Sequence, residues 1–219
     1  MKYKGIIFDL DGVLCQTDEY HYQAWKQLAD RLQIPFDREQ NNSLRGVSRM
    51  ESLNIILANG IRQYSEAEKK MFAAEKNDLY CKQLARMTPD DMPDDVKETL
   101  IALRCSGYKL AVGSSSKNAP TIINHLGIAS FFDAIVDGNS ITRSKPDPEV
   151  FLKAAKLLQL NPSDCLVVED AASGVQAAHA GGFDCAAIGI TACDTSAKWH
   201  IIHLNDLLSI IDGYQDLFP

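Results

Sequence analysis

Short apolar runs alternate with amphipathic stretches over most of this chain. Residues 5–8, 109–113, 132–136, 165–168 and 186–188 are compact apolar runs, a pattern typical of strands that are buried on both faces. The stretches between the later runs repeat apolar residues at helical spacing and are bounded by glycine or proline. Strands that alternate with helices in this way predict a parallel sheet covered by helices on both faces.

The stretch between the first two runs departs from this alternation. From about residue 17 to residue 82 the pattern is helical, with no strand-like run. Ser48 and Ser65 are each followed three residues later by a glutamate, Glu51 and Glu68, which is the spacing of a capping box and predicts two helix starts. We therefore expect an α/β fold with a small all-α cap inserted after the first strand. The expected boundaries are 1–15 and 88–219 for the core domain and 16–87 for the cap domain.

Composition and charge narrow the class of protein. The 219 residues are 46% hydrophobic, which is enough for one core and a small second domain. The formal net charge of -7 disfavours nonspecific binding to nucleic acid or to an anionic membrane surface. No apolar run approaches the ~18 residues of a membrane span, and the N-terminus lacks the pattern of a signal peptide. We expect a cytoplasmic protein whose cysteines are free thiols, since no Cys-x-x-Cys motif occurs. The six cysteines are Cys15, Cys81, Cys105, Cys165, Cys185 and Cys193.

Two carboxylates, Asp9 and Asp11, follow the first apolar run at the point where Gly12 predicts a turn. In open α/β sheets this end of a strand is where ligands bind. One carboxylate of such a pair can attack phosphorus, and the other can move the proton of a hydroxyl. Because two like charges repel unless a cation lies between them, the pair implies Mg²⁺. Alone, an Asp-x-Asp also fits a solvated turn.

Three other strand ends carry polar groups. Ser114 begins a serine-rich loop that leads into a helix N-terminus, which suits a phosphate. Lys145 is held extended by the proline after it and can neutralise a phosphoryl group. Glu169 and Asp170 follow four apolar residues, and carboxylates are the ligands that Mg²⁺ prefers. Each feature alone also fits an ordinary loop or surface residue. Because parallel strand ends share one sheet edge, together they predict a site for phosphoryl transfer.

In order and spacing, the run 9–14 (Asp-Leu-Asp-Gly-Val-Leu) and then Ser114, Lys145 and Glu169-Asp170 resemble the four motifs of the haloacid dehalogenase (HAD) superfamily, over the whole chain. The resemblance implies a HAD-like Rossmannoid core, Asp9 as the nucleophile and Asp11 as the general acid and base. It implies that Ser114 and Lys145 hold the transferring phosphoryl group. It also implies that Mg²⁺ is bound by Asp9, Asp170 and the main-chain carbonyl of Asp11, with Glu169 in support directly or through water.

Cap segments are similar to those of the β-phosphoglucomutase family within this superfamily. They are 19–21 with Trp25, 44–49 with Ser52, 76–78 and 116–118. By this resemblance four residues grip the non-transferring phosphate, namely Arg49, Ser116, Lys117 and Asn118. Lys76, His21 and the Gly46-Val47 backbone would position the sugar and the cap, and Trp25 would mainly pack the cap. A bisphosphate needs two anion sites, and arginine binds phosphate in a bidentate manner.

The resemblance implies interconversion of β-D-glucose 1-phosphate and D-glucose 6-phosphate, with β-D-glucose 1,6-bisphosphate as intermediate and activator. A HAD phosphatase of small sugar phosphates is the alternative, and a phospho-receiver domain fits poorly because of the helical insertion. The expected partner is a small sugar phosphate, with no nucleic acid, no membrane and a monomeric protein. The chain departs from the family at Gln16, which replaces a usual aspartate, at Arg45, which replaces a usual lysine, and at Ala171-Ala172, where the family is more polar.

Overall fold

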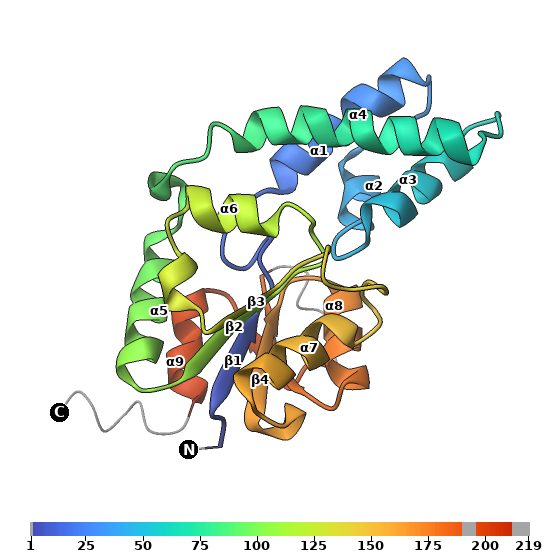
Figure 1. The fold of residues 1–219 in the computed structure, drawn as a ribbon. Helices are drawn as coiled ribbons and strands as arrows, with labels where there is room; N and C mark the ends of the chain where they lie inside the picture. The colour runs from blue at the N-terminus through green and yellow to red at the C-terminus, as the bar shows by residue number, and fades with distance from the viewer. Residues whose placement is uncertain (1, 190–195, 212–219) are drawn as a thin grey trace.

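The computed structural model describes residues 2–189 and 196–211, and these residues form a six-stranded sheet in which every adjacent pair is parallel (Figure 1). The strand order is β3-β2-β1-β4-β5-β6. The strands are β1 (Gly5–Phe8), β2 (Lys109–Gly113), β3 (Ala134–Val136), β4 (Cys165–Glu169), β5 (Asp184–Ile188) and β6 (Trp199–Ile201). The chain leaves central β1 toward β2 and β3 and returns to β4 on its other side, so the strand order reverses next to β1. The predicted α/β class is confirmed.

Two layers of helices cover the sheet, and a further group stands above its edge (Figure 1). The α-helices are α1 (Asp18–Arg31), α2 (Arg38–Asn42), α3 (Arg49–Ala58), α4 (Glu66–Leu84), α5 (Asp94–Cys105), α6 (Ala119–His125), α7 (Glu149–Leu158), α8 (Ala172–Ala180) and α9 (Leu207–Ile210). Short 3-10 helices are η1 (Pro89–Asp91), η2 (Ala129–Phe131), η3 (Pro162–Asp164) and η4 (Leu204–Asp206).

Alternate residues of each central strand point to opposite faces of the sheet. In β1, Ile6 and Phe8 join the cluster beneath α5, α6 and α9, whereas Ile7 joins the cluster beneath α7 and α8. All three are fully buried, and each such side chain contributes about 1.5–3 kcal/mol. Burial on both faces explains why the strands are continuous apolar runs. Because the strands are parallel, their carboxyl ends lie at one edge of the sheet, and this edge carries the site.

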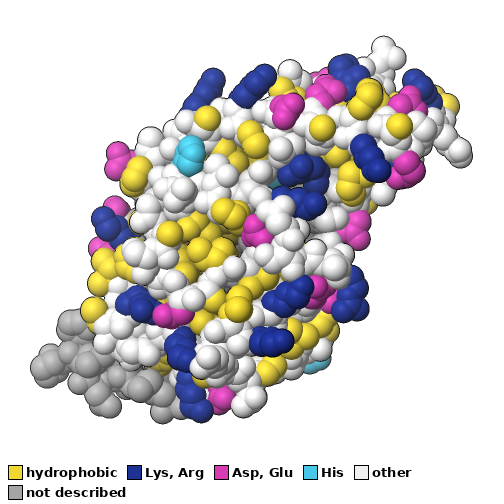
Figure 2. All heavy atoms as spheres, in the orientation of Figure 1, with side chains coloured by type: hydrophobic (Ala, Val, Ile, Leu, Met, Phe, Trp, Pro, Cys, Tyr) yellow, Lys and Arg dark blue, Asp and Glu magenta, His cyan; other side chains and the backbone are white. Residues whose placement is uncertain are grey.

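Helices α1 to α4 enclose a separate hydrophobic cluster around Trp25, Leu53 and Phe72. The Ser65–Glu68 capping box that begins α4 is confirmed: Glu68 N donates to Ser65 Oγ (3.3 Å) and Ser65 N donates to Glu68 Oε2 (2.9 Å). At α3 only half of the predicted box forms. Glu51 N donates to Ser48 Oγ (3.4 Å), but no side chain in the described part of the chain accepts from Ser48 N. Figure 2 shows acidic and basic side chains interspersed over the outer surface of this group.

Several boundaries differ from the prediction. The third strand begins at Ala134 rather than at residue 132, because η2 runs up to Phe131. Helix α7 begins at Glu149, directly after Pro148, and Asp147 Oδ1 accepts from Glu149 N (3.0 Å). Helix α2 and strand β6 were not predicted. Cys15, Cys81, Cys105 and Cys165 are free thiols, and Cys193 lies outside the described residues. None of the helices within the described ranges has the length and apolar character that a membrane crossing requires.

Candidate active site

The carboxyl ends of β1 and β4 bring buried charges together. Asp9 N donates to Val168 O (2.9 Å), which continues the strand pairing into the site. Lys145 Nζ donates to Asp9 Oδ1 (2.5 Å) and also to Glu169 Oε1. The Lys145 side chain is fully buried, and Asp9 is 6% exposed. Lys145 therefore holds Asp9 in one orientation from behind.

The acidic groups of this cluster outweigh its cations. Burial raises the pKa of Asp9 to about 7, with Lys145 opposing the rise and Glu169 and Asp11 adding to it. Burial also raises the pKa of Asp170 well above its usual range, and repulsion from Glu169 and Asp9 adds to the rise. Arg45 Nη1 opposes it from 3.2 Å. Carboxylates under this mutual repulsion are stabilised by an added cation.

The donor set fits Mg²⁺, which takes few carboxylates and completes its shell with water and phosphate oxygens. No group of three or more His, Cys, Asp or Glu side chains among the described residues forms a self-contained metal site. Asp9 and Asp170 each bond a protein cation, Lys145 and Arg45. Gly12 permits the close approach here, since its φ is +88° and a Cβ would lie 2.1 Å from Asp170 Oδ2.

A cavity of about 500 Å³ lies between this sheet edge and helices α1 to α4. Every residue that the sequence assigned to substrate binding lines it, as do Asp9, Asp11 and Ser114. The substrate-binding set is His21, Trp25, Gly46, Val47, Arg49, Ser52, Lys76, Ser116, Lys117 and Asn118. Lys145, Glu169 and Asp170 do not line the cavity and lie buried beneath its wall. Lys145 contacts the nucleophile candidate, and its predicted contact with a phosphoryl group stays a prediction.

Asp11 faces the cap. Its Oδ1 accepts from Thr17 Oγ1 and lies 3.5 Å from Tyr80 Oη and 3.9 Å from His21 Nε2. Burial raises the pKa of Asp11, and the hydrogen bond from Thr17 opposes the rise. A carboxyl with a raised pKa is suited to take up and release a proton.

Lys76, which is buried, and His21, which is partly buried, form a pair next to Asp11. Lys76 Nζ lies 2.8 Å from His21 Nδ1 and 4.6 Å from the ring centroids of Trp25 and Tyr80. Burial lowers the pKa of Lys76 to about 7, and repulsion from Arg49 adds to the shift. Burial likewise lowers the pKa of His21 well below its usual range. The pair therefore places polar hydrogens in the cavity while adding little fixed positive charge.

The other wall of the cavity is cationic. Arg49, Lys70 and Lys117 line it, and none of them forms an ion pair within 4 Å with a described residue. Asn118 Nδ2 donates to Asn77 Oδ1 (2.9 Å), which joins this wall to α4. Ser115 Oγ is buried and has no hydrogen-bond partner in the described part of the chain. Unpaired donors and cations in a partly closed cavity suit a phosphate.

Sequence reasoning missed several lining residues, among them Asp18, Asn41, Met50, Lys70, Ser115, Ile141 and Thr142. Lys70 had a detectable signal, because Ala73 and Lys76 follow it at steps of three on one face of α4. Arg45 was noted only as a substitution, yet it bonds both Asp18 and Asp170.

Comparison with known proteins assigns the family. Residues 3–182 match the family of haloacid dehalogenase-like hydrolases. The chain belongs to this HAD family. It is 42% identical to a β-phosphoglucomutase of Bacillus subtilis over 85% of this chain and 83% of that protein. The fructose-1-phosphate phosphatase YqaB of Escherichia coli is 31% identical over 84% of this chain and 95% of its own.

Solved structures agree with this assignment. A β-phosphoglucomutase from Clostridium difficile superposes with a TM-score of 0.91 at 38% identity, covering 98% of each chain. The predicted HAD fold and the resemblance to β-phosphoglucomutases are confirmed.

Proposed function

We propose that this HAD enzyme is a β-phosphoglucomutase, which interconverts β-D-glucose 1-phosphate and D-glucose 6-phosphate. The observation that carries the proposal is a single cavity with two anion sites. One lies at Asp9 and Ser114, and the other lies at Arg49 and Lys117. A monophosphatase needs only the first, whereas a sugar bisphosphate intermediate uses both. Relatives that are named β-phosphoglucomutases support the same activity.

The proposed cycle begins with phosphorylated Asp9. The 6-hydroxyl of β-D-glucose 1-phosphate attacks the phosphorus while Asp11 takes its proton, which gives β-D-glucose 1,6-bisphosphate and free Asp9. After the bisphosphate turns around, Asp9 attacks the phosphorus on O1, and Asp11 returns its proton to the leaving oxygen. Glucose 6-phosphate departs and Asp9 is again phosphorylated. Lys145 holds Asp9 Oδ1, so Oδ2 is the oxygen proposed to attack.

The remaining roles in the proposed cycle belong to residues around Asp11 and Arg49. Thr17 holds Asp11 facing the sugar hydroxyl through a hydrogen bond, with His21 Nε2 3.9 Å from the same oxygen, and Lys76 beside them donates to the sugar. Arg49 with Ser116, Lys117 and Asn118 binds the phosphate that is not transferred. Ser114 donates to the transferring group. Asp9, Asp170 and the Asp11 carbonyl would hold Mg²⁺, with Glu169 in support. When bound, the ion neutralises charge that develops on the phosphoryl oxygens.

We further propose that the core spans 1–15 and 88–219 and the cap 16–87, that the protein is a cytoplasmic monomer, and that the bisphosphate is its activator. The free thiols of Cys15, Cys81, Cys105 and Cys165 suit a reducing compartment.

Purified protein is assayed with β-D-glucose 1-phosphate, Mg²⁺ and a catalytic amount of the bisphosphate. Glucose 6-phosphate and free phosphate are measured side by side. Rapid glucose 6-phosphate formation with little free phosphate supports the mutase. Phosphate release without isomerisation refutes it and supports the second candidate, a sugar-phosphate phosphatase, which the similarity to the E. coli enzyme favours.

A further inference from the structure

One contact between cap and core lies outside the chemistry described above. Ser144 Oγ, in the loop before α7, donates to Glu51 Oε2 in the first turn of α3 (3.0 Å). Ser48 Oγ donates to the same carboxylate oxygen (2.7 Å). Ser144 directly precedes Lys145, which bonds Asp9, and Glu51 lies two residues after Arg49. The Glu51–Ser144 contact thus joins the first turn of α3, which carries Arg49, to the loop that carries Lys145.

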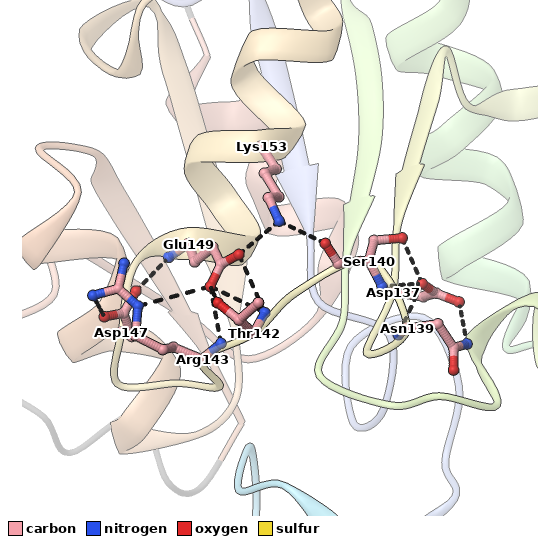
Figure 3. A network of polar contacts seen from close by, with 8 residues as sticks. All are labelled: Asp137, Asn139, Ser140, Thr142, Arg143, Asp147, Glu149 and Lys153. Carbon is pink, nitrogen blue, oxygen red and sulfur yellow. Dashed lines mark hydrogen bonds and ion pairs between the residues drawn. The ribbon is translucent and has the colours of Figure 1, made fainter.

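The core side of this contact is fixed. Figure 3 shows Glu149, at the start of α7, pointing into the loop that contains Thr142 and Arg143. Its carboxylate accepts from Thr142 Oγ1 (2.8 Å), Arg143 N (2.9 Å) and Lys153 Nζ (2.6 Å). Because these bonds attach the loop to α7, Ser144 offers the cap a rigid donor.

On the cap side, Glu51 can accept from Ser144 because α3 lacks a complete capping box. In α4 the matching glutamate, Glu68, accepts from the Ser65 backbone N–H. Glu51 reaches across to Ser144 instead. The hydrogen bond from Ser48, with a further one from Ser144, lowers the pKa of Glu51 although burial opposes this, so the acceptor stays ionised at neutral pH. The same turn of α3 carries Arg49 and Ser52.

The contact also separates two spaces. Ser48, Thr142 and Ser144 line both the cavity and a groove on the outside of the cap–core junction. Glu51 lines the outer groove and not the cavity. The Glu51–Ser144 hydrogen bond therefore lies at the boundary between the cavity and the outer groove.

We propose that Glu51 is a positioning residue of the closed enzyme, which through Ser144 sets Arg49 against the distal phosphate and keeps water from phosphorylated Asp9. This inference rests on the proposed function and deepens it. Glu51 touches no reacting atom. It governs the partition of the phosphorylated enzyme between sugar and water, and thereby separates a mutase from a phosphatase.

The test measures free phosphate released per glucose 6-phosphate formed, together with the KM for the bisphosphate. Ser144→Ala removes only the donor, and we expect both quantities to rise about two- to tenfold, the scale of one ordinary hydrogen bond, because this one is exposed to solvent. Glu51→Ala does the same, and the double variant is no worse than Glu51→Ala alone. Glu51→Gln keeps an acceptor oxygen and stays close to wild type. Thermal midpoints of all variants show that each is folded.

Glu68→Ala is the matched control, since Glu68 occupies the same position in α4 but makes no hydrogen bond or ion pair with a described residue of the core. The inference is overturned if Ser144→Ala and Glu51→Ala partition as wild type does, or if Glu68→Ala leaks phosphate equally. Failure of the proposed function looks different, because the wild type itself then releases phosphate without isomerisation. In that case a KM for phosphate release that is unchanged in Ser144→Ala also overturns the inference, and a raised KM supports the positioning role.

Discussion

Replacing Lys76 by methionine tests the electrostatics of the cavity most directly. Lys76 is 2% exposed, and burial with repulsion from Arg49 lowers its pKa to about 7 from 10.5. The unfolded chain therefore binds a proton at Lys76 up to pH ~10.5, whereas the folded protein binds it only below about pH 7. A difference of about three and a half pH units at ~1.4 kcal/mol each gives a cost to folding on the order of 5 kcal/mol. Methionine keeps most of the apolar stem and removes this cost.

The sign of the pH dependence follows from proton binding. Between pH 7 and 10.5 the unfolded state binds more protons at Lys76, so the stability of the wild type rises with pH over this window. Below about pH 7 the cost is fully present. We therefore expect Lys76→Met to exceed the wild type in free energy of unfolding by a few kcal/mol at pH 6. The gain should shrink steadily toward pH 10.

The assay is urea unfolding followed by circular dichroism at pH 6, 8 and 10. Lys82→Met, at an exposed lysine on the same helix, is the control and should give no pH-dependent difference from wild type. A gain that is constant with pH, or a loss of stability at pH 6, would refute the reasoning. Such a loss would mean that the contacts of Lys76 with His21 and with the rings of Trp25 and Tyr80 outweigh its burial. A variant that is more stable yet inactive would mark Lys76 as a residue kept for function.

Three further predictions concern the buried charges. Asp11→Asn should lower turnover by about 10²–10⁴-fold because the proton carrier is lost, with little change in the urea midpoint. Chelation of Mg²⁺ should abolish turnover and lower the thermal midpoint, because Asp9 and Asp170 lose a counter-ion; added Mg²⁺ should restore both, and an unchanged midpoint would contradict the metal assignment. Lys145→Met should destabilise the protein by about 3–5 kcal/mol in urea unfolding, since it leaves Asp9 and Glu169 buried without their cation.

Much of the fold follows from burial alone. Strand β1 was predicted with its observed bounds because Ile6, Ile7 and Phe8 are all buried between two helical layers, which leaves no polar position in the run. Strand β6 was missed because it lies at the sheet edge and spans only Trp199–Ile201. With His200 exposed, its three residues form no apolar run and are too few to show an alternating pattern. Helix α2 was missed because its five residues are polar, and only Asn41 is buried.

Some residues of the site could also be placed from the sequence, and others could not. Asp9, Ser114 and Glu169 could be placed because parallel strands end at one edge, so position along a strand determines position in space. The contacts of Arg45 with Asp170 and of Glu51 with Ser144 could not, because each joins two segments far apart in sequence. No periodicity connects such residues. These contacts depend only on how α1 to α4 dock onto the core.

The charges that line the cavity explain why the cap and the core need a substrate bound between them. The sheet edge gathers carboxylates whose pKa values are raised, at Asp9, Asp11 and Asp170. The cavity is also lined by Arg49 of the cap and Lys117 of the core, which have no ion-pair partner within 4 Å among the described residues. A phosphate near the acidic edge requires added positive charge, whereas a phosphate at the cationic wall supplies the anion that this wall lacks. A sugar with two phosphates, bound together with Mg²⁺, balances both ends at once. Closure of the cap is then favoured most by the bisphosphate.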